Sequence, residues 1–222
     1  METTEQLITR LAAQARPVRR LRPPMVRAVL WLVGMGGVGG VAIALFSNLD
    51  VTIGRLSEPL LLAELIGILG TAIGAVIAAF YLSVPGRSSR WGLVPIPFFV
   101  LWMASSGDNC YQDWLVHGTD GWALGESFAC FRFILMTGVP IALSLLLILR
   151  RAHPLAPIRV AAIAGLGVAA MAAFLLQFFH TFDITFLDLA VHLAAGAMVA
   201  AGSALVGLSR RRGGFMPPAR PM

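Results

Sequence analysis

Long apolar runs separated by short polar segments dominate the chain. A helix needs roughly 20 apolar residues to cross a bilayer, and six runs approach or exceed that length: residues 28–46, 60–84, 91–106, 130–149, 158–179 and 184–208. The third run is short and contains Pro95 and Pro97, and Pro140 predicts a kink in the fourth. The pattern predicts an all-α, polytopic membrane protein with six transmembrane helices in residues 28–208, preceded by an arm of residues 1–27 and followed by a tail of residues 209–222.

The N-terminal arm carries a hydrophobic pattern of its own. Thr3 and Gln6 have the spacing of a capping box, and Leu7, Ile8 and Leu11 then fall on one face of a helix. A helix this short is marginal in water. We therefore expect the arm either to lie on the bilayer as a leader that sets topology, or to fold against a protein partner.

Composition supports the membrane assignment, and charge orients it. The 222 residues are 58% hydrophobic and only 13% charged, with a mean hydropathy of +0.81, well above that of a soluble domain. All 17 basic residues are arginines; 15 of them fall on one side of the predicted membrane, and nine of the 11 acids fall towards the other. The positive-inside rule puts both termini in the cytoplasm. Because topology explains the net charge of +6, we expect no direct nucleic-acid binding.

Ionisable side chains also lie inside the predicted helices. Glu64, Arg132, Asp188 and His192 fall near the outer ends of their helices, and Asp188 and His192 share a face because they are four residues apart. Charged groups within a membrane are costly, so they pair with one another or face water. We expect Arg132 to pair with Glu64 or Asp188.

Thiol and imidazole side chains gather towards the same outer face. Cys110 and His117 lie in a predicted loop of residues 107–129, Cys130 opens the fourth helix, and His180 precedes the sixth. Such ligands suit zinc, cadmium or copper, although their spacing matches no compact metal motif. A transient metal ion at this periplasmic face, a Cys110–Cys130 disulfide, and packing without reactivity all stay open as interpretations. We expect no permanent cofactor.

Two pairs of glycines have the spacing that lets helices approach closely. Gly36 with Gly40, and Gly70 with Gly74, are each four residues apart on an apolar run. Small residues with this spacing favour contact between transmembrane helices. We expect both pairs to face neighbouring helices.

The common catalytic motifs are missing from the sequence. It has no phosphate loop, no GxSxG, no HExxH and no c-type haem motif, so we expect no enzymatic activity. The main alternative to a binding protein is a small transporter or channel, with a relay at the outer face formed by Glu64, Arg132, Asp188 and His192.

Several stretches resemble one known family along nearly the whole chain. They are LITRLAAQARPVRRLRPP (7–24), LSVPGRSSRW (82–91), CYQDWL (110–115) and LGESFACFRFIL (124–135). The chain resembles the NrsF-type anti-sigma factors, which are six-helix proteins of the bacterial inner membrane. The resemblance implies that the arm holds an extracytoplasmic-function sigma factor at the membrane, away from RNA polymerase.

The resemblance also implies roles for single residues. In the arm, an apolar stripe would bury against the sigma factor and basic side chains would pair with its acids: Leu7, Ile8, Leu11 and Val18, with Arg10, Arg16, Arg19 and Arg20. Cysteines of the family take part in sensing metal or oxidative stress, and Cys130 matches the first of them. The second stands in a His-Cys-Pro stretch, but here residues 177–183 read QFFHTFD without a cysteine. Cys110 or His180 would then replace it as the partner of Cys130.

Overall fold

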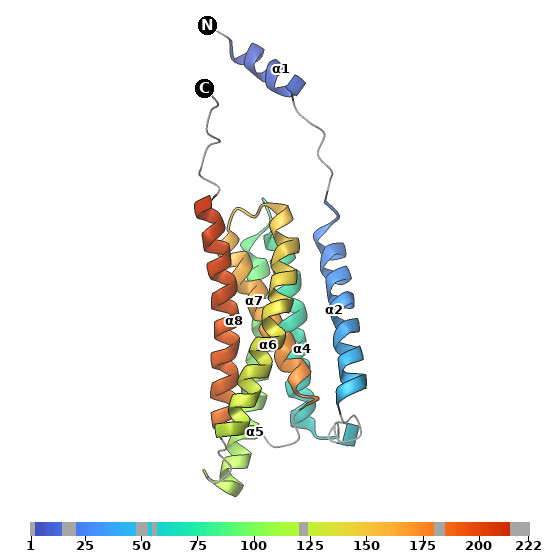
Figure 1. The fold of residues 1–222 in the computed structure, drawn as a ribbon, viewed down its shortest axis with the longest axis vertical. Coiled ribbons are helices and arrows are strands. Elements are labelled where there is room, and N and C mark those ends of the chain that lie inside the picture. Colours follow the sequence, from blue (N-terminus) through green and yellow to red (C-terminus); the bar gives the residue numbers. More distant parts are fainter. Residues whose placement is uncertain are drawn as a thin grey trace.

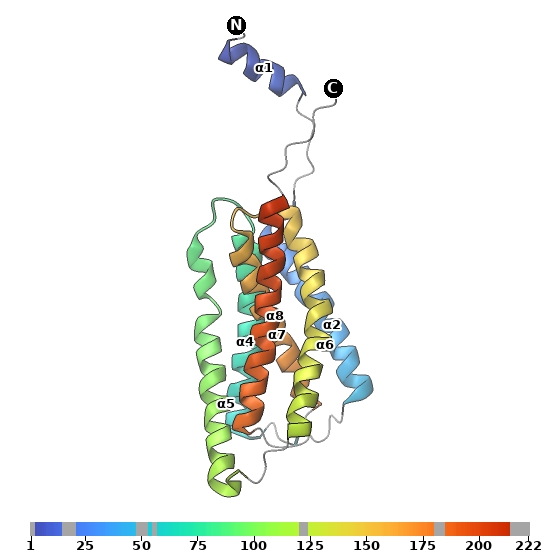
Figure 2. The same ribbon diagram turned by 60° about the vertical axis from the view of Figure 1, so that its left-hand side comes forward.

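The computed structural model describes residues 3–14, 21–47, 53–54, 57–119, 124–179 and 185–213, and within these ranges the chain is helical and has no strand. The helices are α1 (Thr4–Gln14), α2 (Pro24–Phe46), α4 (Pro59–Leu82), α5 (Ile96–His117), α6 (Leu124–Leu149), α7 (Pro157–Leu176) and α8 (Phe186–Gly213), with the 3₁₀ turns η1 (Ser89–Leu93) and η2 (Arg150–Ala152). The long helices α2 and α4–α8 lie side by side in one bundle, whereas α1 lies apart from it (Figure 1, Figure 2).

Prolines begin most of the bundle helices. Pro24, Pro59 and Pro157 occupy the first turns of α2, α4 and α7. A proline at this position loses no hydrogen bond, because the first N–H groups of a helix have no partner within it, and its fixed φ suits the helix. The starts of these three helices consequently lie close to the predicted ones.

Five bundle helices are long and apolar enough to cross a membrane, namely α2, α4, α6 with η2, α7 and α8. For α5 the predicted span of residues 91–106 was wrong at both ends. It begins in η1, and the helix continues to His117, so residues 107–117 are helical and do not form the predicted outer loop. Within this extension Cys110 is buried, whereas Tyr111, Trp114, Leu115 and Val116 are exposed. Gly118, whose φ of 63° is unfavourable for other residues, ends the helix.

The glycine pairs behave differently from each other. Gly70 and Gly74 pack against the Pro95–Phe98 region at the start of α5, as predicted, and a Cβ at Gly70 would clash with the Phe98 ring. The prediction for Gly36 and Gly40 was wrong, because a Cβ at either position would meet nothing within 4 Å. Spacing alone therefore did not reveal which face of α2 is turned towards the bundle.

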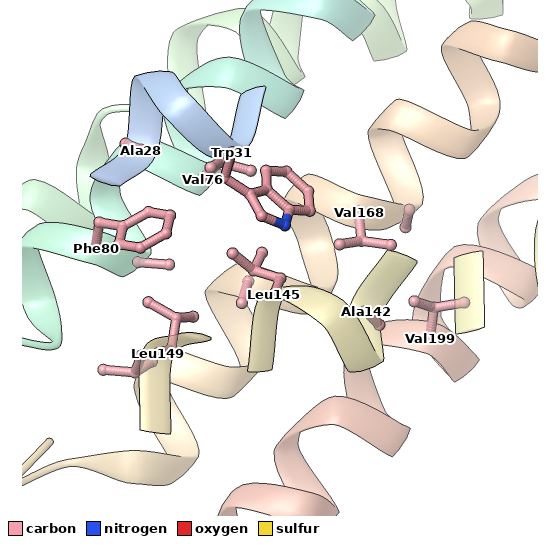
Figure 3. Close-up of a cluster of buried hydrophobic side chains, with 13 residues drawn as sticks. Ala28, Trp31, Val76, Phe80, Ala142, Leu145, Leu149, Val168 and Val199 are labelled. Carbon is pink, nitrogen blue, oxygen red and sulfur yellow. The ribbon is translucent and has the colours of Figure 1, made fainter. Parts of the chain in front are cut away.

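The hydrophobic core centres on α7. Its alanines, glycines and valines are buried along most of its length, between α4, α6 and α8. Figure 3 shows part of this core, with side chains from five helices: Ala28 and Trp31, Val76 and Phe80, Ala142, Leu145 and Leu149, Val168, and Val199. Within a bilayer, where lipid provides no hydrophobic drive for helix association, close packing of small residues would be a main source of attraction between these helices.

α2 is the outlying helix of the bundle. Only three of its 23 residues are buried. Two polar contacts join its first turns to α6: Trp31 Nε1 donates to Ser144 Oγ at 3.2 Å, and Arg27 Nη2 donates to the Ile148 carbonyl at 3.0 Å. The Arg27 guanidinium also lies over the Phe80 ring of α4, 5.1 Å from its centroid.

Charges are segregated between the two ends of the bundle. The start of α2 and the end of α8 lie at the same end, at the top of Figure 1. This basic end carries Arg22, Arg27, Arg87, Arg90, Arg150, Arg151 and Arg159. The opposite, acidic end carries Glu58, Glu64, Asp108, Asp113 and Asp188, together with one arginine among the described residues, Arg132.

Candidate functional site

The first candidate site is the apolar face of α1. The predicted capping box forms at its start, where the Thr3 N–H donates to Gln6 Oε1 at 3.0 Å and the Gln6 N–H donates to Thr3 Oγ1 at 3.3 Å. Leu7, Ile8 and Leu11 are 42%, 60% and 57% exposed, and no residue of this helix is buried. The other residues predicted for this site are Arg10, which is exposed on the same helix, and four that lie outside the described residues: Arg16, Val18, Arg19 and Arg20.

Glu64 is the centre of a hydrogen-bond network at the acidic end. Its side chain is only 2% exposed. The carboxylate accepts hydrogen bonds from Ser106 Oγ at 2.8 Å and Asn109 Nδ2 at 3.0 Å, both on α5, and from Gln177 Nε2 at 3.1 Å, directly after α7. These donors offset the cost of burying an acid. The network joins α4 to α5 and α7.

Asp188 forms a second network at the same end. Its carboxylate accepts from Ser127 Oγ of α6 at 2.6 Å, from Thr185 Oγ1 at 2.8 Å and from the Thr185 N–H at 3.1 Å. The Asp188 N–H donates in return to Thr185 Oγ1 at 3.2 Å, which completes a capping box. His192, one turn later, contacts the Asp188 carbonyl through Nδ1. Asp188 therefore stabilises the first turn of α8 and links α8 to α6 through the hydrogen bond from Ser127.

Arg132 does not join the acids with which we expected it to pair. Its side chain is exposed, and in the described part of the chain Glu64 and Asp188 are bonded to neutral hydroxyl and amide donors instead. Neutral donors satisfy a buried carboxylate without the cost of desolvating a second charge. The predicted cluster is thus distributed over two networks, with Arg132 at the surface.

Both cysteines are buried, and neither is in a disulfide bond. Cys110 on α5 is completely buried, and Cys130 on α6 is 4% exposed. Cys130 packs in an apolar cluster with Ile134, Leu176 and Ala195, from α6, α7 and α8. These surroundings favour packing over reactivity while the bundle stays closed.

The residues predicted to bind a metal ion are only partly within the described structure. His117 is exposed at the end of α5, with its Nδ1 2.9 Å from Asp113 Oδ1. His180 lies outside the described residues. Among the side chains that the structure does describe, no three of His, Cys, Asp and Glu are placed to hold a metal ion. The transient metal ion therefore stays a prediction.

The relay expected of a transporter is not continued by the described residues. Towards the basic end, the buried hydroxyls of Thr71 and Ser83 donate to carbonyls of their own helix, at Gly67 and Phe80. The core around them is apolar. In this part of the molecule no run of polar side chains leads from Glu64 towards the opposite end.

Comparison with known families identifies the chain. The sequence model of a family described as "Negative regulator of sigma F", NrsF, matches residues 11–211. Comparisons with curated proteins and with solved structures gave no match. The matched region includes the last turn of α1 and the bundle almost to its end, and it confirms the resemblance noted in the sequence. The chain belongs to the NrsF family, and the description of this family is that of a negative regulator of a sigma factor.

Proposed function

We propose that this protein is a membrane-anchored anti-sigma factor that sequesters an extracytoplasmic-function sigma factor through α1. It releases this partner when a metal or redox signal acts at the periplasmic face. In this proposal α2 and α4–α8 all cross the bacterial inner membrane, and both termini lie in the cytoplasm. The observation that carries the proposal is the exposed apolar face of α1 in a member of this family, formed by Leu7, Ile8 and Leu11.

The exposed face of α1 suits a helix that binds in a groove. An isolated helix of 11 residues is marginal in water, and an amphipathic helix gains stability when a hydrophobic groove covers its apolar side. Fully burying a leucine or isoleucine side chain contributes about 1.5–3 kcal/mol. Arg10 lies beside this face and would pair with acids at the rim of such a groove, chiefly raising the association rate.

Leu11→Asp tests this contact, because it places a charge in the apolar face. We expect the affinity for the sigma factor to fall about a hundredfold, which corresponds to about 3 kcal/mol. Sigma-dependent transcription should then rise without stress, while the protein still accumulates in the membrane. Ala13→Asp is the matched control, because it adds the same charge to the opposite, exposed face of α1, and it should leave binding nearly unchanged.

Pull-down of the sigma factor with the full-length protein distinguishes the alternatives. Equal losses in Leu11→Asp and Ala13→Asp would argue against an apolar contact. Normal binding in both variants, and after deletion of residues 7–20, would make the arm a leader on the bilayer. The transporter interpretation, which needs no soluble partner, would then be the better one.

In this proposal the metal or redox signal acts at the acidic end of the bundle. The networks of Glu64 and Asp188 join the helices there, so a change of packing at this end would reach the whole bundle. Near-complete release of a partner needs on the order of 5 kcal/mol of differential binding, which one thiolate–metal site is able to provide. Cys130 is the proposed sensing residue because it lies on α6 one turn after Ser127. Since it is 4% exposed, a signal must act on it when the helices separate locally.

Serine substitutions test the input separately from binding of the sigma factor. Cys130→Ser replaces a soft ligand by a hard, weak one, so it should leave repression intact and strongly reduce induction by cadmium or an oxidant. Loss of induction in Cys110→Ser as well would support a pair of thiols, whereas loss only in Cys130→Ser would support a Cys–His site. An unchanged response in the double variant would mean that both thiols are structural.

A further inference from the structure

A groove at the basic end of the bundle is lined by arginine and apolar side chains, none of which belongs to α1. It lies between the start of α2 and the end of α6, and its volume is about 430 Å³. Arg22, Arg27 and Arg151 line it, and none of its lining residues in the described structure is acidic. Further along α2 the lining becomes apolar, with Leu30 and Met35. The groove is therefore cationic at one end and apolar at the other.

Arg27, which lines the cationic part, has one donor that is unsatisfied within the described structure. Its Nη2 donates to the Ile148 carbonyl at 3.0 Å, but its Nη1 is buried with no hydrogen-bond acceptor among the described residues. A buried charged donor without an acceptor is costly. Three guanidinium groups around one groove also repel one another. An anion between them would reduce the repulsion and accept hydrogen bonds from the exposed guanidinium groups of Arg22 and Arg151.

We propose that this groove binds an anionic phospholipid, with its phosphate between the arginines and an acyl chain along Leu30 and Met35. Arg27 stands in the first turn of a helix that is apolar enough to cross a membrane, which is where such a helix meets the lipid headgroups. Met35 lies eight residues further on, or about 12 Å deeper along the helix axis. A free phosphate or a protein carboxylate would occupy only the cationic part and would leave the apolar part empty.

The bound lipid would complete the packing of α2. This helix has few buried residues and contacts α6 through single polar bonds of Trp31 and Arg27. A lipid in the groove would contact both helices at the point where the chain enters from the arm. It would thereby stabilise the position of α2 without using any residue of α1.

Lipid retention by the full-length protein tests this proposal. The protein would be purified from vesicles that contain equal amounts of phosphatidylglycerol and phosphatidylcholine, and the bound lipid would be measured by native mass spectrometry. We expect a preference of at least tenfold for phosphatidylglycerol, and a reduction of about fivefold for each of Arg22→Gln and Arg151→Gln. Both arginines are exposed, so neither change should disturb the fold. Arg90→Gln, at an exposed arginine of the same end outside the groove, is the control and should change nothing.

Three outcomes would overturn the proposal. Equal retention of the two lipids would exclude recognition of the anionic headgroup. An equal effect of Arg90→Gln would mean that general surface charge, and not the groove, selects the lipid. Displacement of the lipid by excess inorganic phosphate would assign the cationic part to a free anion.

Discussion

Glu64 joins α4 to α5 and to the end of α7 through its hydrogen bonds. Glu64→Leu would remove the acceptor of three hydrogen bonds and leave Ser106, Asn109 and Gln177 to find other partners. We expect the free energy of unfolding in mixed micelles to fall by about 2–4 kcal/mol. Asp108→Leu likewise replaces a carboxylate by leucine, at an exposed position of α5, and should alter the stability by less than about 0.5 kcal/mol. Similar effects of the two changes would contradict the network.

The buried thiols give a second prediction at this scale. Cys110 is completely buried and Cys130 is 4% exposed, so a membrane-impermeant maleimide should label both at least tenfold more slowly than an accessible cysteine. Gln112→Cys, at an exposed position of α5, supplies that reference in a variant in which both native cysteines are serine. Rapid labelling of Cys130 without any inducing signal would mean that the closed packing described for α6, α7 and α8 does not persist.

The sequence was informative about which single residues need a partner but not about what the partner is. Glu64 and Asp188 stand out because an acid within an apolar run is costly. Their actual partners, such as Ser106 and Gln177, are common neutral residues whose contacts depend on the rotation of helices far apart in the sequence. Pairing by opposite charge predicted Arg132 as the partner of Glu64 or Asp188, but Arg132 is exposed. Pairing by charge failed because hydroxyl and amide groups satisfy a buried acid at lower desolvation cost.

Among the elements, α5 packs closely against α4. A Cβ at Gly67 of α4 would lie 2.6 Å from the backbone nitrogen of Trp102 in α5, a clash that no side-chain movement relieves. Gly67→Ala should therefore lower the stability in detergent by about 1–3 kcal/mol. Gly40→Ala, where a Cβ would meet nothing within 4 Å, should be neutral or stabilise by up to about 1 kcal/mol, because alanine favours the helix. Equal thermal stability of both variants would argue that α5 does not pack on α4 as described.

Element boundaries were predictable where the signal is local. The capping box of α1 and the prolines at the starts of α2, α4 and α7 fix backbone geometry within a few residues, so those starts were located well. The length of α5 was not predictable from hydropathy, because Gly107, Asp108 and Asn109 interrupt the apolar run although the helix continues through them. Their helical state depends on the contact with α4, which the sequence does not display.

At the scale of the whole molecule, the number of crossings decides where the termini lie. Among the helices that the structure describes, five are apolar enough to span a membrane, and α5 runs beside them in the bundle (Figure 2). If α5 crosses too, the number is even and both termini share the arginine-rich side. Reporter fusions after Met222 and at Ser88 should then report the cytoplasm, and a fusion near Asp120 the periplasm. A periplasmic signal after Met222 would mean an odd number of crossings and would remove the basis for a cytoplasmic C-terminus.

The length of chain between α1 and α2 limits the distance between the bundle and a partner bound to α1. Nine residues separate Gln14 from Pro24, and a segment of that length spans at most about 35 Å whatever its conformation. A sigma factor held by α1 would therefore stay in a thin layer beside the membrane, on a carrier that diffuses only in two dimensions. Confinement to that layer would keep the partner away from DNA further from the membrane, even if its DNA-binding surface stayed uncovered.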